Sequence, residues 1–176
     1  SQMTRAQKVK ALLSLMFLKE KRCGKVKGRA CINGAPQRAY IPKEEAASPT
    51  VMNESVFITA AIAAHEKRFV SCFDVPGAFL HTDTDEEVFM ILKGDLAEMM
   101  VRIAPEVYRK FVTVDSKGTP ILYVKLRKAL YGLLRSSLLF YRKLRSELEE
   151  YGFVVNPYDP CVANKTVQIK KTVQKR

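Results

Sequence analysis

The segment around Asp74 offers a carboxylate at a position suited to binding a metal ion. Residues 68–73 form an apolar run typical of a strand that is covered on both faces, and Asp74 follows it directly. Pro76 has no N–H to donate and Gly77 relaxes the backbone, so we expect the strand to end and the chain to turn there. A carboxylate at the end of a buried strand is costly unless it is compensated, and a divalent cation such as Mg²⁺ supplies that compensation. The alternative is a carboxylate that caps the following turn.

Asp74 opens the second of four motifs that follow one another along the chain. Residues 46–51 read Ala-Ala-Ser-Pro-Thr-Val, residues 74–80 read Asp-Val-Pro-Gly-Ala-Phe-Leu, and residues 125–133 read Lys-Leu-Arg-Lys-Ala-Leu-Tyr-Gly-Leu. Residues 151–162 begin with Tyr-Gly-Phe and end with Asp-Pro-Cys-Val. In order and spacing these motifs resemble those of the reverse transcriptases of copia-type LTR retrotransposons. The resemblance covers roughly residues 15–166.

The resemblance implies an α+β fold: the fingers and a partial palm of a right-hand polymerase, with an antiparallel sheet and packed helices. It also implies RNA-directed DNA synthesis on a template–primer with dNTP, by two-metal nucleotidyl transfer that uses Mg²⁺. The intact protein would be a larger polyprotein with integrase and RNase H regions. The expected division is a single reverse transcriptase domain fragment over 1–176, with fingers-like parts at 1–68 and 88–126, a partial palm at 69–87 and 127–166, and a basic tail at 167–176.

Roles for individual residues also follow from the resemblance. Asp74 would be catalytic and would bridge both metal ions, and the backbone carbonyl of Val75 would add a ligand. Phe79 would lie under the deoxyribose and exclude a 2′-hydroxyl. Gly132 would let the chain pass close to the template or nucleotide, because it has no Cβ.

Basic residues are in clear excess in this sequence. The 176 residues include 30 Lys and Arg against 18 Asp and Glu, and the net charge of +12 suits a nucleic-acid partner, although a generic basic surface gives the same total. Basic residues between 19 and 29, interrupted by Gly24 and Gly28, predict a charged β-hairpin. By resemblance Lys27 and Arg29 would contact the incoming triphosphate; a solvated basic hairpin is the alternative.

A predicted helix from Ser136 or Ser137 to Gly152 carries its charges in an unusual order. Basic residues come early and acidic residues late, which opposes the helix dipole at both ends. We interpret Arg142 and Arg145, together with Arg135, as binding an anionic partner such as nucleic acid; core packing that overrides a small dipole cost is the alternative.

The remaining pattern predicts the elements that position these residues. We expect an amphipathic helix at 5–18, loops at 33–51, a buried helix from Thr50 or Asn53 to His65, a strand at 88–92, a helix at 95–112 broken at Pro105, and strands at 110–114 and 120–126. The acidic residues between 83 and 87 are expected to be solvated. The four cysteines lack zinc-site spacing and are expected to be free thiols in a reducing compartment.

The second and third carboxylates of the resembled family are not recognisable. They belong to an Asp-Asp motif, but neither Asp nor Glu follows Asp159. We therefore expect a fragment that is inactive as this chain. The alternative is a domesticated or residual nucleic-acid-binding module without catalysis. No apolar run approaches the ~20 residues of a membrane span, so we expect a soluble protein without a membrane partner. We expect it to be intracellular, with cytoplasm and nucleus both open.

Overall fold

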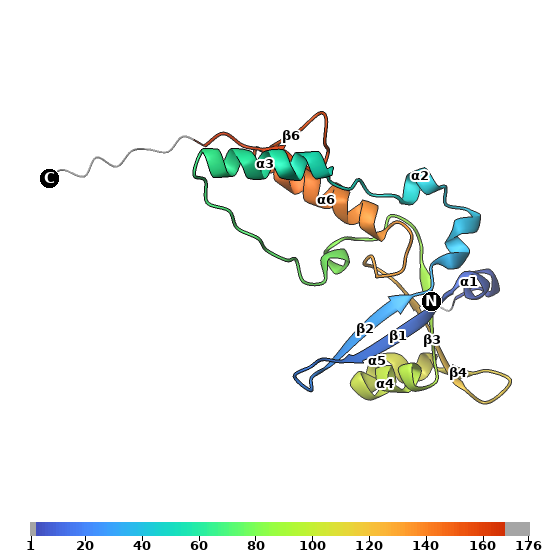
Figure 1. Ribbon diagram of the computed structural model, residues 1–176. Helices are drawn as coiled ribbons and strands as arrows, with labels where there is room; N and C mark the ends of the chain where they lie inside the picture. The colour runs from blue at the N-terminus through green and yellow to red at the C-terminus, as the bar shows by residue number, and fades with distance from the viewer. Residues whose placement is uncertain (1–2, 168–176) are drawn as a thin grey trace. The chain divides into compact units, whose positions relative to one another are not determined.

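The computed structural model describes residues 3–167 and divides the chain into two compact units (Figure 1). Unit 1 comprises Ser1–Ala47 and Pro76–Phe140, and unit 2 comprises Ser48–Val75 and Tyr141–Arg176. Unit 1 contains the larger sheet, and unit 2 contains a long helix and a two-stranded sheet. No helix among the described residues is long and apolar enough to cross a membrane.

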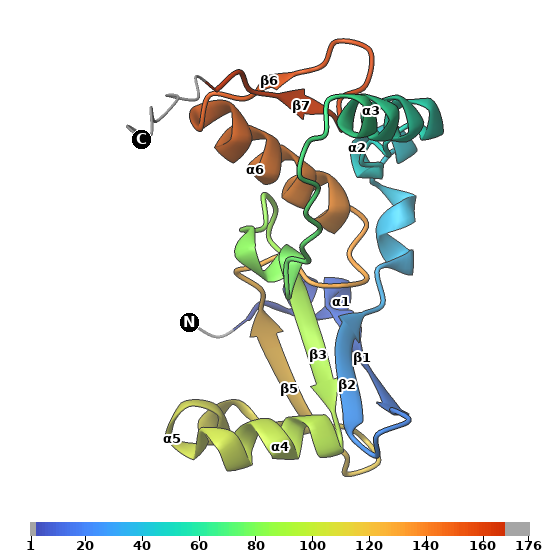
Figure 2. The ribbon, with the colours of Figure 1, turned by 60° about the vertical axis from the view of Figure 1, so that its left-hand side comes forward.

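Unit 1 is organised around a five-stranded sheet of order β2-β1-β3-β5-β4, of which Figure 2 labels β1, β2, β3 and β5. Its strands are β1 Leu12–Glu20, β2 Val26–Ile32, β3 Phe89–Lys93, β4 Thr113–Val114 and β5 Pro120–Lys125. All neighbouring pairs are antiparallel except β1 and β3, which are parallel. A mixed α/β fold with a mostly antiparallel sheet agrees with the predicted fold class.

The two hydrophobic clusters of unit 1 lie on one face of this sheet. Leu92 pairs with Leu122 across β3 and β5, and both pack against Ala97 of helix α4, Asp95–Ile103. A second cluster joins Leu12, Ile32, Val88 and Leu133. Because side chains alternate along a strand, Phe89 and Tyr123 lie on the opposite face of the sheet. The short helices of this unit are α1 Arg5–Lys10, η1 Ala35–Ala39, α2 Lys43–Ala46, η2 Ala78–His81, α5 Pro105–Tyr108 and η3 Arg109–Phe111.

The N-terminal helix is shorter than predicted, and this expectation was wrong beyond residue 10. The predicted capping box of Thr4 and Gln7 is present, but β1 replaces the expected continuation of the helix. The apolar run from Leu12 is also compatible with a strand. As a strand, this segment forms backbone hydrogen bonds with β2, which it could not form as a helix. The predicted basic hairpin is confirmed, since β1 and β2 pair antiparallel around it.

The other predicted elements of unit 1 are confirmed in outline. Helices α4 and α5 are separated at Pro105, as expected, and β4 is shorter than the strand predicted at 110–114 because η3 takes its first residues. Residues 33–51 hold η1 and α2, where only loops and short extended pieces were expected.

Unit 2 contains helix α3, Asn53–His65, and the two-stranded sheet of β6, Val154–Val155, and β7, Ala163–Asn164. Most of helix α6, Ser136–Glu150, also belongs to unit 2, and its bounds agree with the prediction. Helix α3 forms where it was predicted, but none of its residues is buried, so the expected burial against a sheet was wrong. Within residues 3–167, no strand covers its apolar surface, on which Phe57 is 73% exposed.

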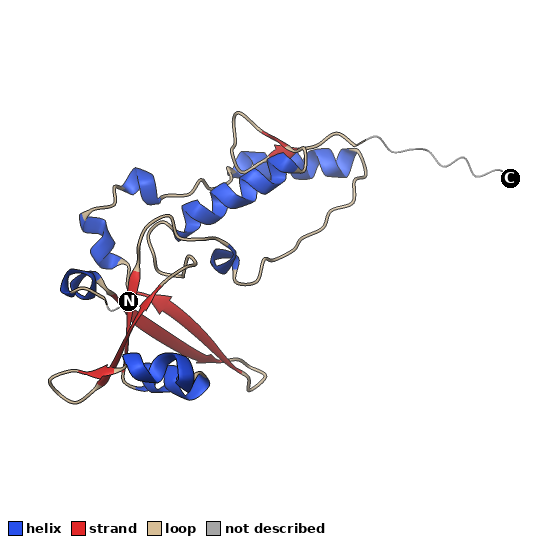
Figure 3. Ribbon diagram, turned by 180° about the vertical axis from the view of Figure 1, so that it is seen from behind, coloured by secondary structure: helices blue, strands red, loops and turns tan. Residues whose placement is uncertain are grey.

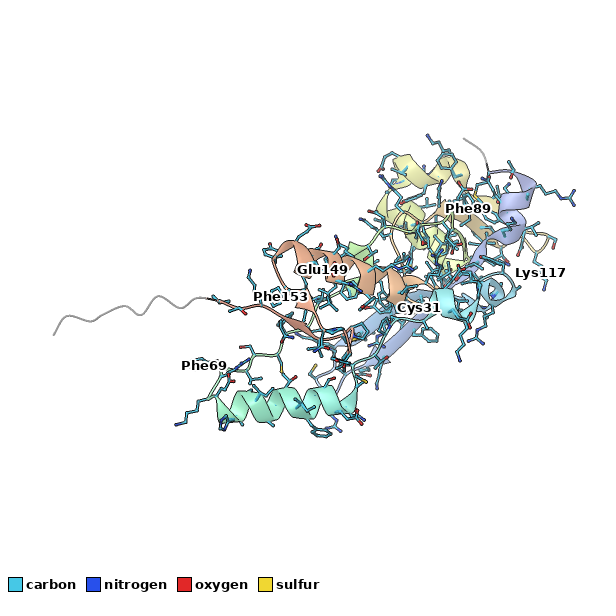
Figure 4. All side chains as sticks on the ribbon, turned by 90° about the horizontal axis from the view of Figure 1, so that it is seen from above. Cys31, Phe69, Phe89, Lys117, Glu149 and Phe153 are labelled. Carbon is cyan, nitrogen blue, oxygen red and sulfur yellow. The ribbon has the colours of Figure 1, made fainter. Side chains whose placement is uncertain are left out.

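The predicted buried strand at residues 68–73 is also wrong. Figure 3 shows the connection after α3 as loop, and Phe69, labelled in Figure 4, is fully exposed. Phe73 is 90% exposed as well. A strand needs a partner for its backbone N–H and C=O groups, and no strand among the described residues pairs with this segment. Residues 68–73 therefore have the apolar pattern of a buried strand but are not paired with another strand among the described residues.

Candidate functional site

Asp74 lies in this irregular connection, with an exposed side chain. It makes no hydrogen bond or ion pair with the described residues, and neighbouring Val75 is 36% exposed. The predicted turn after it is present, because Gly77 has a φ of 62° and its carbonyl accepts a hydrogen bond from the Leu80 N–H at 2.7 Å. The geometry places Asp74 just before a tight turn, and its metal-binding role stays a prediction.

The donor groups around Asp74 do not make a magnesium site. Among residues 3–167, no group of three or more His, Cys, Asp or Glu side chains is placed to hold a metal ion. Mg²⁺ requires near-octahedral oxygen coordination. Asp74 alone would supply only a small part of the six oxygens, so the described side chains do not by themselves form a magnesium site.

Phe79 brings the motif at residues 74–80 into contact with the later Ala-Leu-Tyr-Gly motif. Its ring centroid is 4.5 Å from that of Tyr131 and 6.3 Å from that of Phe140, and all three residues belong to unit 1. Aromatic pairs at these separations stabilise one another beyond the area they bury. Sequence reasoning singled out Phe79 and missed Tyr131, although Tyr131 directly precedes the predicted Gly132.

Gly132 is held against the backbone of β2. Its φ is 99°, and a Cβ built there would overlap the carbonyl oxygen of Ile32. The Ile32 N–H donates to the Tyr131 carbonyl at 2.8 Å, and a Cβ at Gly34 would overlap the Gly132 carbonyl oxygen. Glycine is therefore required at Gly132 by the close approach of two backbones of this chain. Passage of the template or nucleotide beside Gly132 stays a prediction.

A buried glutamine that sequence reasoning missed supports the same loop. Gln37 is fully buried, its Nε2 donates to Glu86 at 2.9 Å, and its Oε1 accepts from the Leu134 N–H at 3.1 Å. Burial raises the pKa of the Glu86 carboxyl, and neighbouring Asp85 raises it further, while Arg135 and the bond from Gln37 oppose the shift. A lone glutamine after a proline gives no sequence signal for this role.

The acidic residues at 83–87 are solvated in the main, as expected, since Asp83, Asp85 and Glu87 are exposed, but each of these three also has a basic partner. Asp83 pairs with Lys128 at 2.8 Å and Glu87 with Lys125 at 2.6 Å. Asp85 pairs at 2.7 Å with Arg135, one of the predicted nucleic-acid contacts. The Arg135 side chain is only 21% exposed. Asp85 would therefore compete with a phosphate for this guanidinium.

The two other predicted basic contacts lie on α6. Arg145 donates to Glu149 at 2.9 Å, which raises the pKa of the guanidinium, and Lys143 pairs with Glu147 at 2.6 Å. These (i, i+4) pairs give the charges partners within the helix, so the order of the charges does not by itself require an anionic partner. Arg142 is exposed and makes no ion pair with the described residues.

Lys27 and Arg29 lie on β2 of the basic hairpin. Lys27 is opposite Lys19, and Arg29 is opposite Phe17, so these four side chains share one face. Both predicted triphosphate contacts are exposed. Both are therefore accessible to an anion, and they share one face of the hairpin.

Asp159, the first residue of the Asp-Pro-Cys-Val motif, has a structural role within unit 2. It is 1% exposed and accepts hydrogen bonds from the N–H groups of Met52 and Cys161, each at 2.9 Å. The Ser55 side chain also bonds it, and these contacts together lower the pKa of the Asp159 carboxyl. Asp159 thus satisfies the N-terminus of α3, a role that sequence reasoning missed.

Comparison with known proteins identifies the class. Residues 7–167 match the family described as "Reverse transcriptase (RNA-dependent DNA polymerase)", so the chain belongs to this polymerase family. Its curated relatives place it among the copia-type retrotransposon sequences. The Pol polyprotein of transposon TNT 1-94 from Nicotiana tabacum is 29% identical over 136 residues, 77% of this chain. Those of transposons RE1 and RE2 from Arabidopsis thaliana are 28% and 27% identical over 128 residues, 73% of this chain.

The chain is short beside these relatives. The matched part spans 9% of the TNT 1-94 polyprotein and 8% of each Arabidopsis polyprotein. No solved structure matches the chain. The predicted reverse transcriptase resemblance is confirmed, and the roles of single residues are not tested by these matches.

Proposed function

We propose that this chain is a fingers and partial-palm segment of a copia-type RNA-directed DNA polymerase that acts on template–primer and dNTP. The observation that carries this proposal is the contact of Phe79 with Tyr131, because it joins two separate motifs of the family in one aromatic cluster. Residues 1–68 and 88–126 are the fingers-like part and residues 69–87 and 127–166 the partial palm. The whole protein is a larger polyprotein with integrase and RNase H regions.

The incoming nucleotide would meet residues of both parts. Phe79 is half-buried, so one side of its ring is supported by Tyr131 and Phe140 while part of it stays accessible to a sugar. Lys27 and Arg29 are exposed cations suited to a triphosphate. In this arrangement the Phe79 ring would select the sugar of the nucleotide, and the two cations of the hairpin would attract its phosphates.

The chain by itself is proposed to lack polymerase activity. Two-metal nucleotidyl transfer would need further carboxylates beside Asp74, and the donor set of the described residues does not supply them. The residues of this chain would bind and orient the nucleotide and the template–primer, and would attract them by their positive charge.

Primer extension tests this proposal. The purified chain is incubated with an annealed primer–template and dNTPs, in Mg²⁺ and separately in Mn²⁺, and we expect no extension above background. Extension that disappears in Asp74→Ala would overturn the proposed inactivity and show that Asp74 is catalytic. An active reverse transcriptase serves as the positive control for the substrate.

Nucleic-acid binding without catalysis is the second candidate function. The net charge of +12 and the exposed, basic β1–β2 hairpin favour it. Affinity for a duplex primer–template should then fall linearly in a log–log plot against salt, with a slope of about 0.9 for each phosphate contact. Absence of binding at low salt would remove this candidate.

A further inference from the structure

A groove of about 450 Å³ lies beside helix α4 in unit 1. Its apolar part is formed by four residues: Ala97 and Val101 of α4, Val112 before β4, and Pro120 of β5. Ala97 is fully buried in the core cluster, whereas Val101, Val112 and Pro120 are only half-buried. Because this surface is partly uncovered, the groove can bury an apolar side chain of a partner.

Charged side chains of both signs line the same groove. Arg102 and Arg109 supply two guanidinium groups, and Glu98 supplies one carboxylate. The side chains of Arg102 and Glu98 are 3.6 Å apart and are 79% and 48% exposed, so their ion pair is weak. Arg109 is exposed and makes no ion pair with the described residues. The groove therefore carries one excess positive charge, and both of its guanidinium groups are accessible.

These groups match a peptide better than a nucleic acid. None of the described residues that line the groove is aromatic, whereas single strands are bound by stacking their bases on aromatic rings. The carboxylate of Glu98 would repel a chain of phosphates, but it can accept a hydrogen bond from a peptide N–H. The planar guanidinium group of arginine binds a carboxylate through two parallel hydrogen bonds. An acidic peptide with an apolar side chain therefore complements all three kinds of group.

We propose that this groove is a docking site for an acidic segment of another protein. The segment inserts an apolar side chain between α4 and β5 and places its carboxylates at Arg102 and Arg109. The net charge of +12 favours the approach of such a partner. None of the lining residues belongs to the nucleotide, metal or primer–template contacts proposed above, so the groove is additional to them. Its small size is typical of a weak, transient interface.

Fluorescence anisotropy with a labelled acidic peptide tests the site in the complete 176-residue chain. The probe, Gly-Ser-Asp-Glu-Leu-Phe-Asp-Glu-Ser-Gly, should bind saturably at low salt, and absence of saturable binding would overturn the proposal. Arg102→Gln with Arg109→Gln should weaken binding about tenfold or more, because both guanidinium groups are lost. Val101→Gln should weaken it about fivefold, because an amide replaces part of the apolar surface. Circular dichroism checks that each variant is folded.

Matched variants make the same changes outside the groove. Arg5→Gln with Arg38→Gln removes two exposed guanidinium groups, and Ile103→Gln changes a residue of α4 that is 74% exposed. Both controls should bind the peptide like the parent chain. Equal losses in the groove variants and the controls would overturn the site, since they would show binding by overall charge or by exposed apolar surface alone.

Backbone amide chemical shifts locate the bound peptide. They should change most between residues 97 and 112 and around Pro120, which line the groove. The exposed apolar side chains of α3 are the competing surface for the leucine and phenylalanine of the peptide. Shifts that are largest in α3 would overturn the groove as the binding site.

Three further probes separate the possible ligands. A peptide with serine in place of leucine and phenylalanine, and one with amides in place of the carboxylates, should each bind at least fivefold more weakly than the parent peptide. Equal binding of either would overturn the proposed complementarity. A labelled 12-residue oligo(dT) should lose no more affinity in the Arg102→Gln, Arg109→Gln variant than in the Arg5→Gln, Arg38→Gln control. A clearly larger loss would assign the groove to nucleic acid and overturn the peptide site.

Discussion

Asp159 accepts a hydrogen bond at 2.9 Å from the backbone N–H of Met52, which lies 107 residues earlier in the chain. Met52 directly precedes α3 and has no side-chain cap of its own. The carboxylate supplies the acceptor and the negative charge that a helix N-terminus favours. One residue of a late motif thereby fixes the start of a helix that follows an early motif.

The hydrogen bonds that Asp159 accepts from the Ser55 side chain and from the Met52 and Cys161 N–H groups predict a pH-dependent stability. Because the folded-state pKa of Asp159 is lowered, its contribution is present above the unfolded-state value of about 3.9 and is lost as pH falls through the folded-state value. Asp159→Asn should therefore melt below the parent chain at neutral pH, and the difference should shrink on acidification. Thermal melts between pH 7 and 3 measure it, with Glu20→Gln as the exposed control. A difference that is independent of pH would contradict the electrostatic role.

Gly132 offers a test of the close backbone approach. Gly132→Ala should destabilise the chain by more than about 2 kcal/mol, because it adds left-handed strain and an overlap with the Ile32 carbonyl. Gly118→Ala is the matched control: its φ of 79° is also left-handed, but no atom lies within 4 Å of its added Cβ. It should cost only about 1 kcal/mol. Urea unfolding of both variants compares them, and equal losses would show that contact with Ile32 is unimportant.

Gln37 is predicted to stabilise the loop through its two hydrogen bonds. Gln37→Met keeps the approximate volume but leaves the Leu134 N–H and Glu86 without this partner, at a cost of about 1–3 kcal/mol. Gln7→Met removes an exposed amide and should change stability by less than about 1 kcal/mol. Urea unfolding distinguishes them; a neutral Gln37→Met would mean that water replaces the lost bonds.

The sequence predicted local elements better than long-range pairing. Pro105 and the cap at Thr4 marked helix boundaries correctly because these signals depend on neighbouring residues. The run from Leu12 suited both a helix and a strand, and its pairing with β2 decided between them. The positions of Gln37 and Asp159 could not be predicted, since each acts on a backbone group far away in the chain.

The candidate site divides in the same way. The motif residues Phe79 and Gly132 were found from short patterns, whereas the reason for Gly132 lies in the backbone of Ile32, which no local pattern reveals. The ion pair of Arg135 with Asp85 likewise joins two segments whose charges, read separately, indicated an anion site and a solvated turn. The sequence shows the sign of each charge, but it does not show which residue each charged side chain pairs with.

The last prediction concerns the apolar run before Asp74. A phenylalanine in a buried strand would cost about 3–5 kcal/mol when replaced by alanine. Phe73 is 90% exposed, so Phe73→Ala should change the free energy of unfolding by less than about 0.5 kcal/mol. Asp74→Asn should be equally neutral, and millimolar Mg²⁺ should leave both melting temperatures unchanged, because no cluster of ligands surrounds this carboxylate in the described chain.

Leu122→Ala, in the buried core, is the positive control and should cost about 2–5 kcal/mol. A large loss in Phe73→Ala would show that residues 68–73 are buried in solution, and a Mg²⁺-dependent rise in melting temperature that Asp74→Asn abolishes would establish a metal site.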